Sequence, residues 1–93
     1  MKKVTFFYVR GCPYCRQARE VRKELIGENP AYAEIPFEEI DEGKERALAD
    51  QYDYYYTPAM FLGKEKLYEA HPGESRQECR ENMRKVLEQA YLA

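Results

Sequence analysis

Apolar residues along this chain form short runs and helical stripes, separated by charged segments and turn residues. The run Val4–Val9 is β-branched and aromatic on both alternating faces, which predicts a central strand covered on both sides. A helix is predicted to follow, with Cys12 at the N-cap, Pro13 at the first helical position and a stop at Gly27–Pro30. Its inward stripe, at helical spacing, is Ala18, Val21 and Leu25.

The middle of the chain predicts one more strand and one short helix. Residues 33–40 have the composition of a strand, and Pro36 within them indicates an edge position because proline cannot donate to the ladder. Residues 43–52 predict a short charged helix with Ala47 and Leu48 facing inward.

The last third of the chain predicts a hairpin followed by a long helix. Residues 59–62 and 66–70 are the two predicted strands, joined by a turn at residues 63–65. Ser75 and Glu78 have the spacing of a capping box, which predicts where the helix begins. The apolar stripe of this helix is Cys79, Met83, Val86, Leu87 and Ala90.

These elements, in the order β-α-β-α-β-β-α, predict an α/β protein. The first crossover should be right-handed and its two strands parallel, while the hairpin adds two antiparallel strands. We therefore expect a four-stranded mixed sheet flanked by three helices. The 93 residues suit a single domain spanning 1–93, and no repeat or linker divides them.

Composition and charge argue against several classes of function. A formal net charge of −2 gives no reason to expect nucleic acid or an anionic membrane as partner. Three cysteines argue against a disulfide-stapled secreted scaffold, which usually carries more of them in even number. No apolar segment approaches the length of a membrane span. We expect a cytoplasmic location and a monomer.

The chemistry concentrates in Cys12-Pro13-Tyr14-Cys15, at the junction of the first strand and the first helix. Two thiols one helical turn apart suit reversible dithiol/disulfide exchange, and the positive end of a helix stabilises a thiolate. Cys12 lies nearest the unpaired N–H groups, and Arg10 and Arg16 add positive potential. We predict that Cys12 attacks a substrate disulfide and that Cys15 resolves the mixed disulfide.

This motif, the order of elements and the Thr57-Pro58 step before the third strand together resemble a dithiol glutaredoxin. The resemblance covers nearly the whole chain. It implies a thioredoxin fold of the glutaredoxin-like kind, a cis peptide bond at Pro58 and no bound cofactor. It also implies glutathione as co-substrate in the reduction of protein or small-molecule disulfides.

The resemblance further implies a groove for glutathione or another thiol substrate. Three positions depart from the family pattern: the threonine is adjacent to Pro58, Arg10 is only two residues before Cys12, and one glycine, Gly73, replaces the usual pair. The residues expected to line the groove are Arg10, Tyr14, Thr57, Pro58, Gly73, Glu74 and Ser75.

Other interpretations stay open. One is a thioredoxin-like reductase that takes electrons from a flavoprotein disulfide reductase without glutathione. Another is an iron–sulfur carrier, which Pro13 disfavours because the carriers of the family commonly lack proline there.

We predict no metal site, because a structural zinc needs four ligands and only His71 and Cys79 remain as soft candidates. The tyrosines of residues 52–56 either pack against the sheet or form a rim that faces the substrate.

Overall fold

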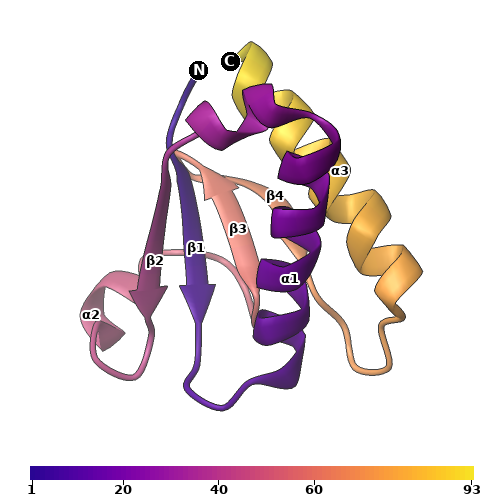
Figure 1. The fold of residues 1–93 in the computed structure, drawn as a ribbon. Helices are drawn as coiled ribbons and strands as arrows, with labels where there is room; N and C mark the ends of the chain where they lie inside the picture. Colours follow the sequence, from indigo (N-terminus) through magenta and orange to yellow (C-terminus); the bar gives the residue numbers. More distant parts are fainter.

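The computed structural model describes all residues from 1 to 93 and has a four-stranded mixed sheet at its centre (Figure 1). The sheet has the strand order β2-β1-β3-β4, with β1 and β2 parallel and the other neighbouring pairs antiparallel. The strands are β1 (Val4–Tyr8), β2 (Phe37–Asp41), β3 (Ala59–Leu62) and β4 (Glu65–Glu69). The helices are α1 (Pro13–Glu28), α2 (Arg46–Ala49) and α3 (Arg76–Leu92), with a 3₁₀ segment at Pro30–Glu34.

Strand β1 is central and buried on both faces, as its sequence predicts. It hydrogen-bonds to β2 on one side and β3 on the other, and Val4, Phe6 and Phe7 are fully buried. The strand ends at Tyr8, so the loop that leads to the two cysteines begins one residue earlier than predicted. Strand β2 lies at one edge of the sheet, as Pro36 indicates.

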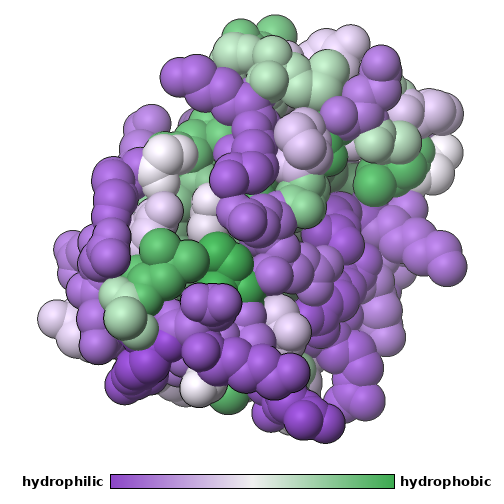
Figure 2. Space-filling view, turned by 90° about the vertical axis from the view of Figure 1, so that its left-hand side faces the viewer, coloured by the Kyte–Doolittle hydropathy of each residue, from purple (hydrophilic) through white to green (hydrophobic).

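Alternate residues of β1 contribute to two separate apolar layers. Phe6 belongs to the larger layer, which α1 and α3 form side by side on one face of the sheet (Figure 1). Phe7 belongs to the smaller layer on the opposite face, together with Ile40 and with Ala49 of α2. The side of the molecule that carries β2 and α2 is mostly hydrophilic, with small separate hydrophobic patches (Figure 2). The residues of the smaller layer are nevertheless buried, with Ile40 the most exposed at 7%.

The strand predicted for residues 33–40 is wrong in its first half. The chain instead forms the 3₁₀ segment, and β2 begins only at Phe37. The Asn29 side chain accepts a hydrogen bond from the Ala31 N–H at 3.3 Å, and Pro30 has the fixed φ that suits a helical start. These two local preferences prevail over the apolar pattern that suggested an extended conformation.

The helix predicted for residues 43–52 is also too long. Helix α2 spans only Arg46–Ala49, Ala47 is exposed, and Ala49 is the buried residue. The Asp41 side chain accepts a hydrogen bond from the Gly43 N–H at 2.9 Å, which makes a turn where the helix was expected to begin.

Helix α3 begins and packs as predicted. Ser75 is its N-cap, and the reciprocal hydrogen bonds of the capping box with Glu78 are both present. All five residues of the predicted stripe are buried. The boundary therefore followed from local chemistry alone.

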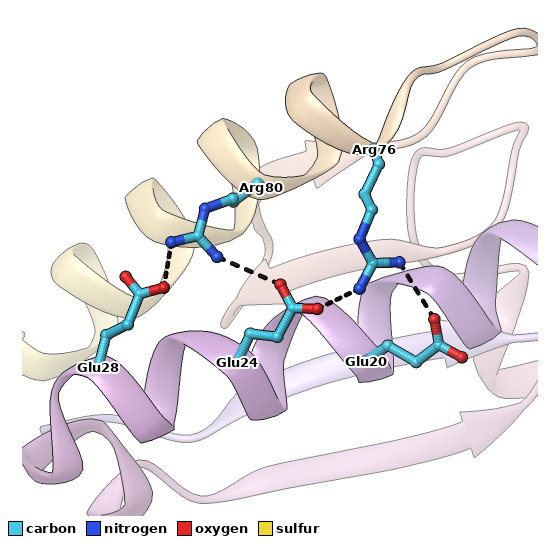
Figure 3. Close-up of polar contacts among 5 residues, drawn as sticks. All are labelled: Glu20, Glu24, Glu28, Arg76 and Arg80. Atoms are coloured by element: carbon cyan, nitrogen blue, oxygen red, sulfur yellow. Dashed lines mark hydrogen bonds and ion pairs between the residues drawn. The ribbon is translucent and has the colours of Figure 1, made fainter.

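A row of ion pairs joins α1 to α3 along their shared side (Figure 3). Arg76 lies between Glu20 and Glu24, and Arg80 lies between Glu24 and Glu28. Surface pairs of this kind contribute little singly and more as a network. The row adds to the apolar contacts that hold the cysteine-bearing helix against α3.

Candidate active site

Cys12 is the N-cap of α1, in the extended conformation that this position requires. Its Sγ accepts a hydrogen bond from the Cys15 backbone N–H at 3.2 Å, and Pro13 occupies the first helical position. Both features match the sequence prediction. Cys12 is half-buried, whereas Cys15 is fully buried in the first turn. Only the first sulfur is therefore open to a substrate.

The loop before β3 forms the second wall of the site. The Thr57-Pro58 peptide bond is cis, which confirms the expectation drawn from the resemblance. The Thr57 hydroxyl and the Cys12 Sγ are 3.6 Å apart, and the Thr57 carbonyl oxygen lies at the same distance from that sulfur. The carbonyl accepts from a Cys12 thiol, while the hydroxyl donates to a Cys12 thiolate.

The two cysteines have opposite acid–base behaviour. For Cys12, partial burial opposes ionisation, but hydrogen bonds from Cys15, Thr57 and the backbone outweigh it and lower the pKa of the thiol. For Cys15, burial and the hydrogen bond with Cys12 raise the pKa to about 12. Cys12 therefore ionises more readily than an ordinary thiol, whereas Cys15 stays protonated at neutral pH.

The loop before α3 reaches the motif through Tyr14. The Gly73 N–H donates to the Tyr14 hydroxyl at 2.8 Å, across 59 positions of sequence. Gly73 has a φ of +82°, a conformation that side chains of other residues rarely allow. Tyr14 and Gly73, two residues expected in the groove, therefore lie together beside the cysteines.

The side chains of Glu74 and Ser75 serve the fold of this loop. Glu74 is only 6% exposed, and the Tyr68 hydroxyl donates to one of its carboxylate oxygens. The other oxygen has no hydrogen-bond partner, and burial raises the pKa of this carboxyl. The Ser75 hydroxyl accepts from the Glu78 N–H. These two side chains do not point freely into a groove.

The tyrosines of residues 52–56 divide into two groups. Tyr52 and Tyr54 pack on Phe7, with ring centroids 4.7 and 5.0 Å from the centroid of its ring, and so pack against the sheet as the first interpretation proposed. Tyr55 and Tyr56 are 86% and 51% exposed, next to Thr57.

Sequence reasoning missed the residue that holds the exposed tyrosines in place. Glu69 of β4 accepts hydrogen bonds from the Tyr55 and Tyr56 N–H groups at 2.6 and 2.7 Å. It also pairs with Lys66. Nothing in the local sequence distinguishes Glu69 from the other glutamates, since its partners lie 13 and 14 positions away.

Cys79 and His71 take no part in the site. Cys79 is fully buried in the core, as its position in the α3 stripe predicts. His71 is exposed and contacts the Glu78 carboxylate at 2.7 Å.

No group of three or more histidine, cysteine or acidic side chains is arranged to hold a metal ion. None of the helices combines the length and apolar composition that crossing a membrane requires.

The chain is similar to two solved structures, one of which gives the fold as thioredoxin-like. The chain is similar to a structure described as that of a malarial protein, with a TM-score of 0.58 and 17% identity over 98% of this chain and 97% of that one. It is also similar to the zinc-bound form of human ERp44, a thioredoxin-fold protein, with a TM-score of 0.53 and 16% identity. That match covers 91% of this chain but only 26% of the ERp44 chain.

No family model matches the chain, and no curated protein does. At these identities the structural likeness concerns the fold alone, so the chemistry has to be argued from the site.

Proposed function

We propose that this protein is a glutathione-linked thiol-disulfide oxidoreductase of glutaredoxin type, acting in a reducing cytoplasm. The observation that carries the proposal is the unequal pair of thiols. Cys12 is accessible, caps a helix and has a lowered pKa, while Cys15 is buried one turn away with a raised pKa. This is the arrangement that an attacking thiol and a resolving thiol need.

The reaction consists of two exchanges. The Cys12 thiolate attacks one sulfur of a substrate disulfide, forms a mixed disulfide and expels the other substrate sulfur as a thiolate, which takes a proton from solvent. Cys15 then loses its proton and attacks the Cys12 sulfur, which releases the second substrate thiol and leaves a Cys12–Cys15 disulfide. Two electrons have passed to the substrate. Two molecules of glutathione return them and become glutathione disulfide.

The residues that face and flank Cys12 support an extended thiol substrate. The Thr57 backbone and hydroxyl face the sulfur from one side, and Tyr14 with Gly73 lies at the start of the neighbouring loop. The turn at Gly73 leaves its surroundings open, with no atom within 4 Å of the position that a Cβ would occupy. Glutathione bound here would have backbone groups rather than Glu74 as its main partners.

A second candidate is a thioredoxin-like reductase driven by a flavoprotein disulfide reductase. The burial of Glu74 and the capping role of Ser75 favour it, because neither side chain is free to bind the charged ends of glutathione. The dithiol chemistry is the same in both cases, and only the source of electrons differs.

A coupled assay separates the two candidates. NADPH consumption is followed with a disulfide substrate, either with glutathione and glutathione reductase or with thioredoxin reductase. Turnover in the first arm supports the proposal, and turnover only in the second arm replaces it with the alternative. Cys12→Ser should abolish turnover in either arm, while Cys15→Ser should accumulate a mixed disulfide that mass spectrometry detects. Cys79→Ala, a change in the core away from the motif, is the matched control.

The pH dependence of alkylation tests the roles of the two thiols. Cys12 should react with iodoacetamide at a pH below that needed by an ordinary thiol, and Cys15 should stay unmodified until the pH approaches 12, because only thiolates react. Equal labelling of both residues at every pH would refute the assignment.

A further inference from the structure

The loop that forms the second wall of the site is tied to the end of strand β4 by one carboxylate. One oxygen of Glu69 accepts hydrogen bonds from the Tyr55 and Tyr56 N–H groups at 2.6 and 2.7 Å, and the other pairs with Lys66 at 2.7 Å. Burial opposes ionisation of Glu69, but the Lys66 ammonium and the two N–H groups outweigh it and lower the pKa of the carboxyl. Glu69 therefore stays charged at neutral pH, and hydrogen bonds to a charged acceptor are about twice as strong as neutral ones.

Little else fixes the backbone of these two loop residues. The Tyr55 and Tyr56 side chains are largely exposed, so packing gives them little support. Their N–H groups bond only to Glu69, and their carbonyl groups take part in no backbone hydrogen bond. The position of this stretch of chain, which leads directly into Thr57, therefore depends on the Glu69 carboxylate.

Thr57 is the residue of the loop that meets the attacking sulfur. On its far side, the Pro58 carbonyl accepts from the Ala70 N–H at 3.0 Å, so the loop is attached to the end of β4 both before and after Thr57. The Thr57 hydroxyl lies 3.6 Å from the Cys12 Sγ. Hydrogen bonds weaken steeply when donor and acceptor are poorly aligned, so this contact depends on where the loop is held.

We infer that Glu69 is a positioning residue that sets the reactivity of Cys12 through Thr57. Its hydrogen bonds go to the loop and to Lys66 rather than to the sulfur. By fixing the backbone before Thr57, it keeps the hydroxyl directed at the Cys12 thiolate. A donor that is already in place stabilises the thiolate more than one that must first be ordered. This inference rests on the proposed function, since it concerns the thiol that attacks.

The sign of the effect separates positioning from direct electrostatics. If the negative charge of Glu69 acted on Cys12 through space, it would disfavour the thiolate, and removing the charge would lower the pKa of the thiol. Positioning predicts the opposite, because a released loop loses the hydrogen bond from the Thr57 hydroxyl and the pKa of Cys12 rises.

Thiolate absorbance against pH, measured for Glu69→Ala and Glu69→Gln, tests the inference. Below pH 9 the signal reports Cys12, since burial raises the pKa of Cys15 and of Cys79, and Cys12→Ser supplies the baseline. Complete loss of one hydrogen bond corresponds to about a fivefold smaller thiolate fraction at a pH below the pKa. Glu69→Ala should give a fall of about two- to threefold within that limit. Glu69→Gln, which keeps an uncharged acceptor, should lie between Glu69→Ala and the wild type.

Two variants of the same strand serve as controls. Glu65→Ala removes an exposed glutamate of β4 that lies outside the contacts of Glu69, and it should leave the thiolate fraction as in the wild type. Lys66→Gln removes the ion pair but keeps both hydrogen bonds to the loop, so it should change the thiolate fraction little. Urea unfolding of every variant checks that the protein is folded.

A double substitution tests the route through Thr57. In Thr57→Val the hydroxyl is already absent, so adding Glu69→Ala should not reduce the thiolate fraction further. A further fall as large as that in the wild-type background would overturn this route. An unchanged or larger thiolate fraction in Glu69→Ala would overturn the positioning role and leave the dithiol function intact. If the wild-type Cys12 titrates as an ordinary thiol and reduces no disulfide, the proposed function fails, and the inference fails with it.

Discussion

Thr57→Val should make Cys12 a weaker acid and a slower nucleophile. The Thr57 hydroxyl lies 3.6 Å from the Cys12 sulfur and is one of the hydrogen-bond donors that lower the pKa of this thiol. Valine has nearly the same shape but no donor, and the Thr57 carbonyl stays in place. The substitution therefore removes stabilisation from the thiolate and leaves the wall of the site standing.

The size of the effect follows from the contact. A single hydrogen bond is worth about 1 kcal/mol, and the 3.6 Å separation gives no reason to assume more. One kcal/mol corresponds to about a fivefold smaller thiolate fraction at a pH below the pKa. The alkylation rate should fall less, by about two- to threefold, because each remaining thiolate is more basic and reacts faster.

Two measurements check this prediction. Thiolate absorbance near 240 nm is followed against pH, and the rate of Cys12 alkylation is measured on the same samples. Thr57→Ser keeps the hydroxyl and should behave like the wild type, which controls for the change in side-chain shape. Unchanged thiolate absorbance in Thr57→Val would refute the view that this hydroxyl stabilises the thiolate.

Three further predictions concern the stability of the fold that holds the site. Leu87→Ala should lower the free energy of unfolding in urea by about 3 kcal/mol, because Leu87 of α3 is fully buried in the larger apolar layer. A cost near zero would contradict its place in the core. Ser75→Ala should cost about 1 kcal/mol by removing the cap of α3, and Ser75→Asp, which keeps an acceptor, should recover most of it. The double substitution Arg76→Gln and Arg80→Gln should lower the melting temperature at low salt, and the difference from the wild type should shrink in 1 M salt. A difference that does not depend on salt would show that the loss of the ion pairs is not what lowers the melting temperature.

Much of the fold could be predicted because it depends on neighbours in sequence. The central strand followed from an apolar run, and the start of α3 followed from the capping box of Ser75 and Glu78. The errors at residues 33–36 and at the start of α2 have a local origin too. There, the side chains of Asn29 and Asp41 accept hydrogen bonds from nearby backbone N–H groups and form turns. The apolar pattern alone does not show whether the chain takes these turns or the predicted strand and helix.

The surroundings of the site were harder to predict. Glu74 was expected to face a ligand, yet it is buried against Tyr68. Glu69 was not singled out at all, although it holds the loop before Thr57. Both are glutamates in a chain rich in glutamate, so their roles depend on which strand lies beside them. Sequence spacing carries no information on that.

By itself, the sequence determined the two thiols, their order and their unequal positions at the start of a helix. Cys12, Pro13 and Cys15 interact within one turn, so short-range backbone chemistry decides their geometry. Only the tertiary structure decided what surrounds the attacking sulfur. Thr57 meets Cys12 across 45 positions of sequence because β3 pairs with β1, and that pairing depends on the burial of the whole sheet rather than on any local signal.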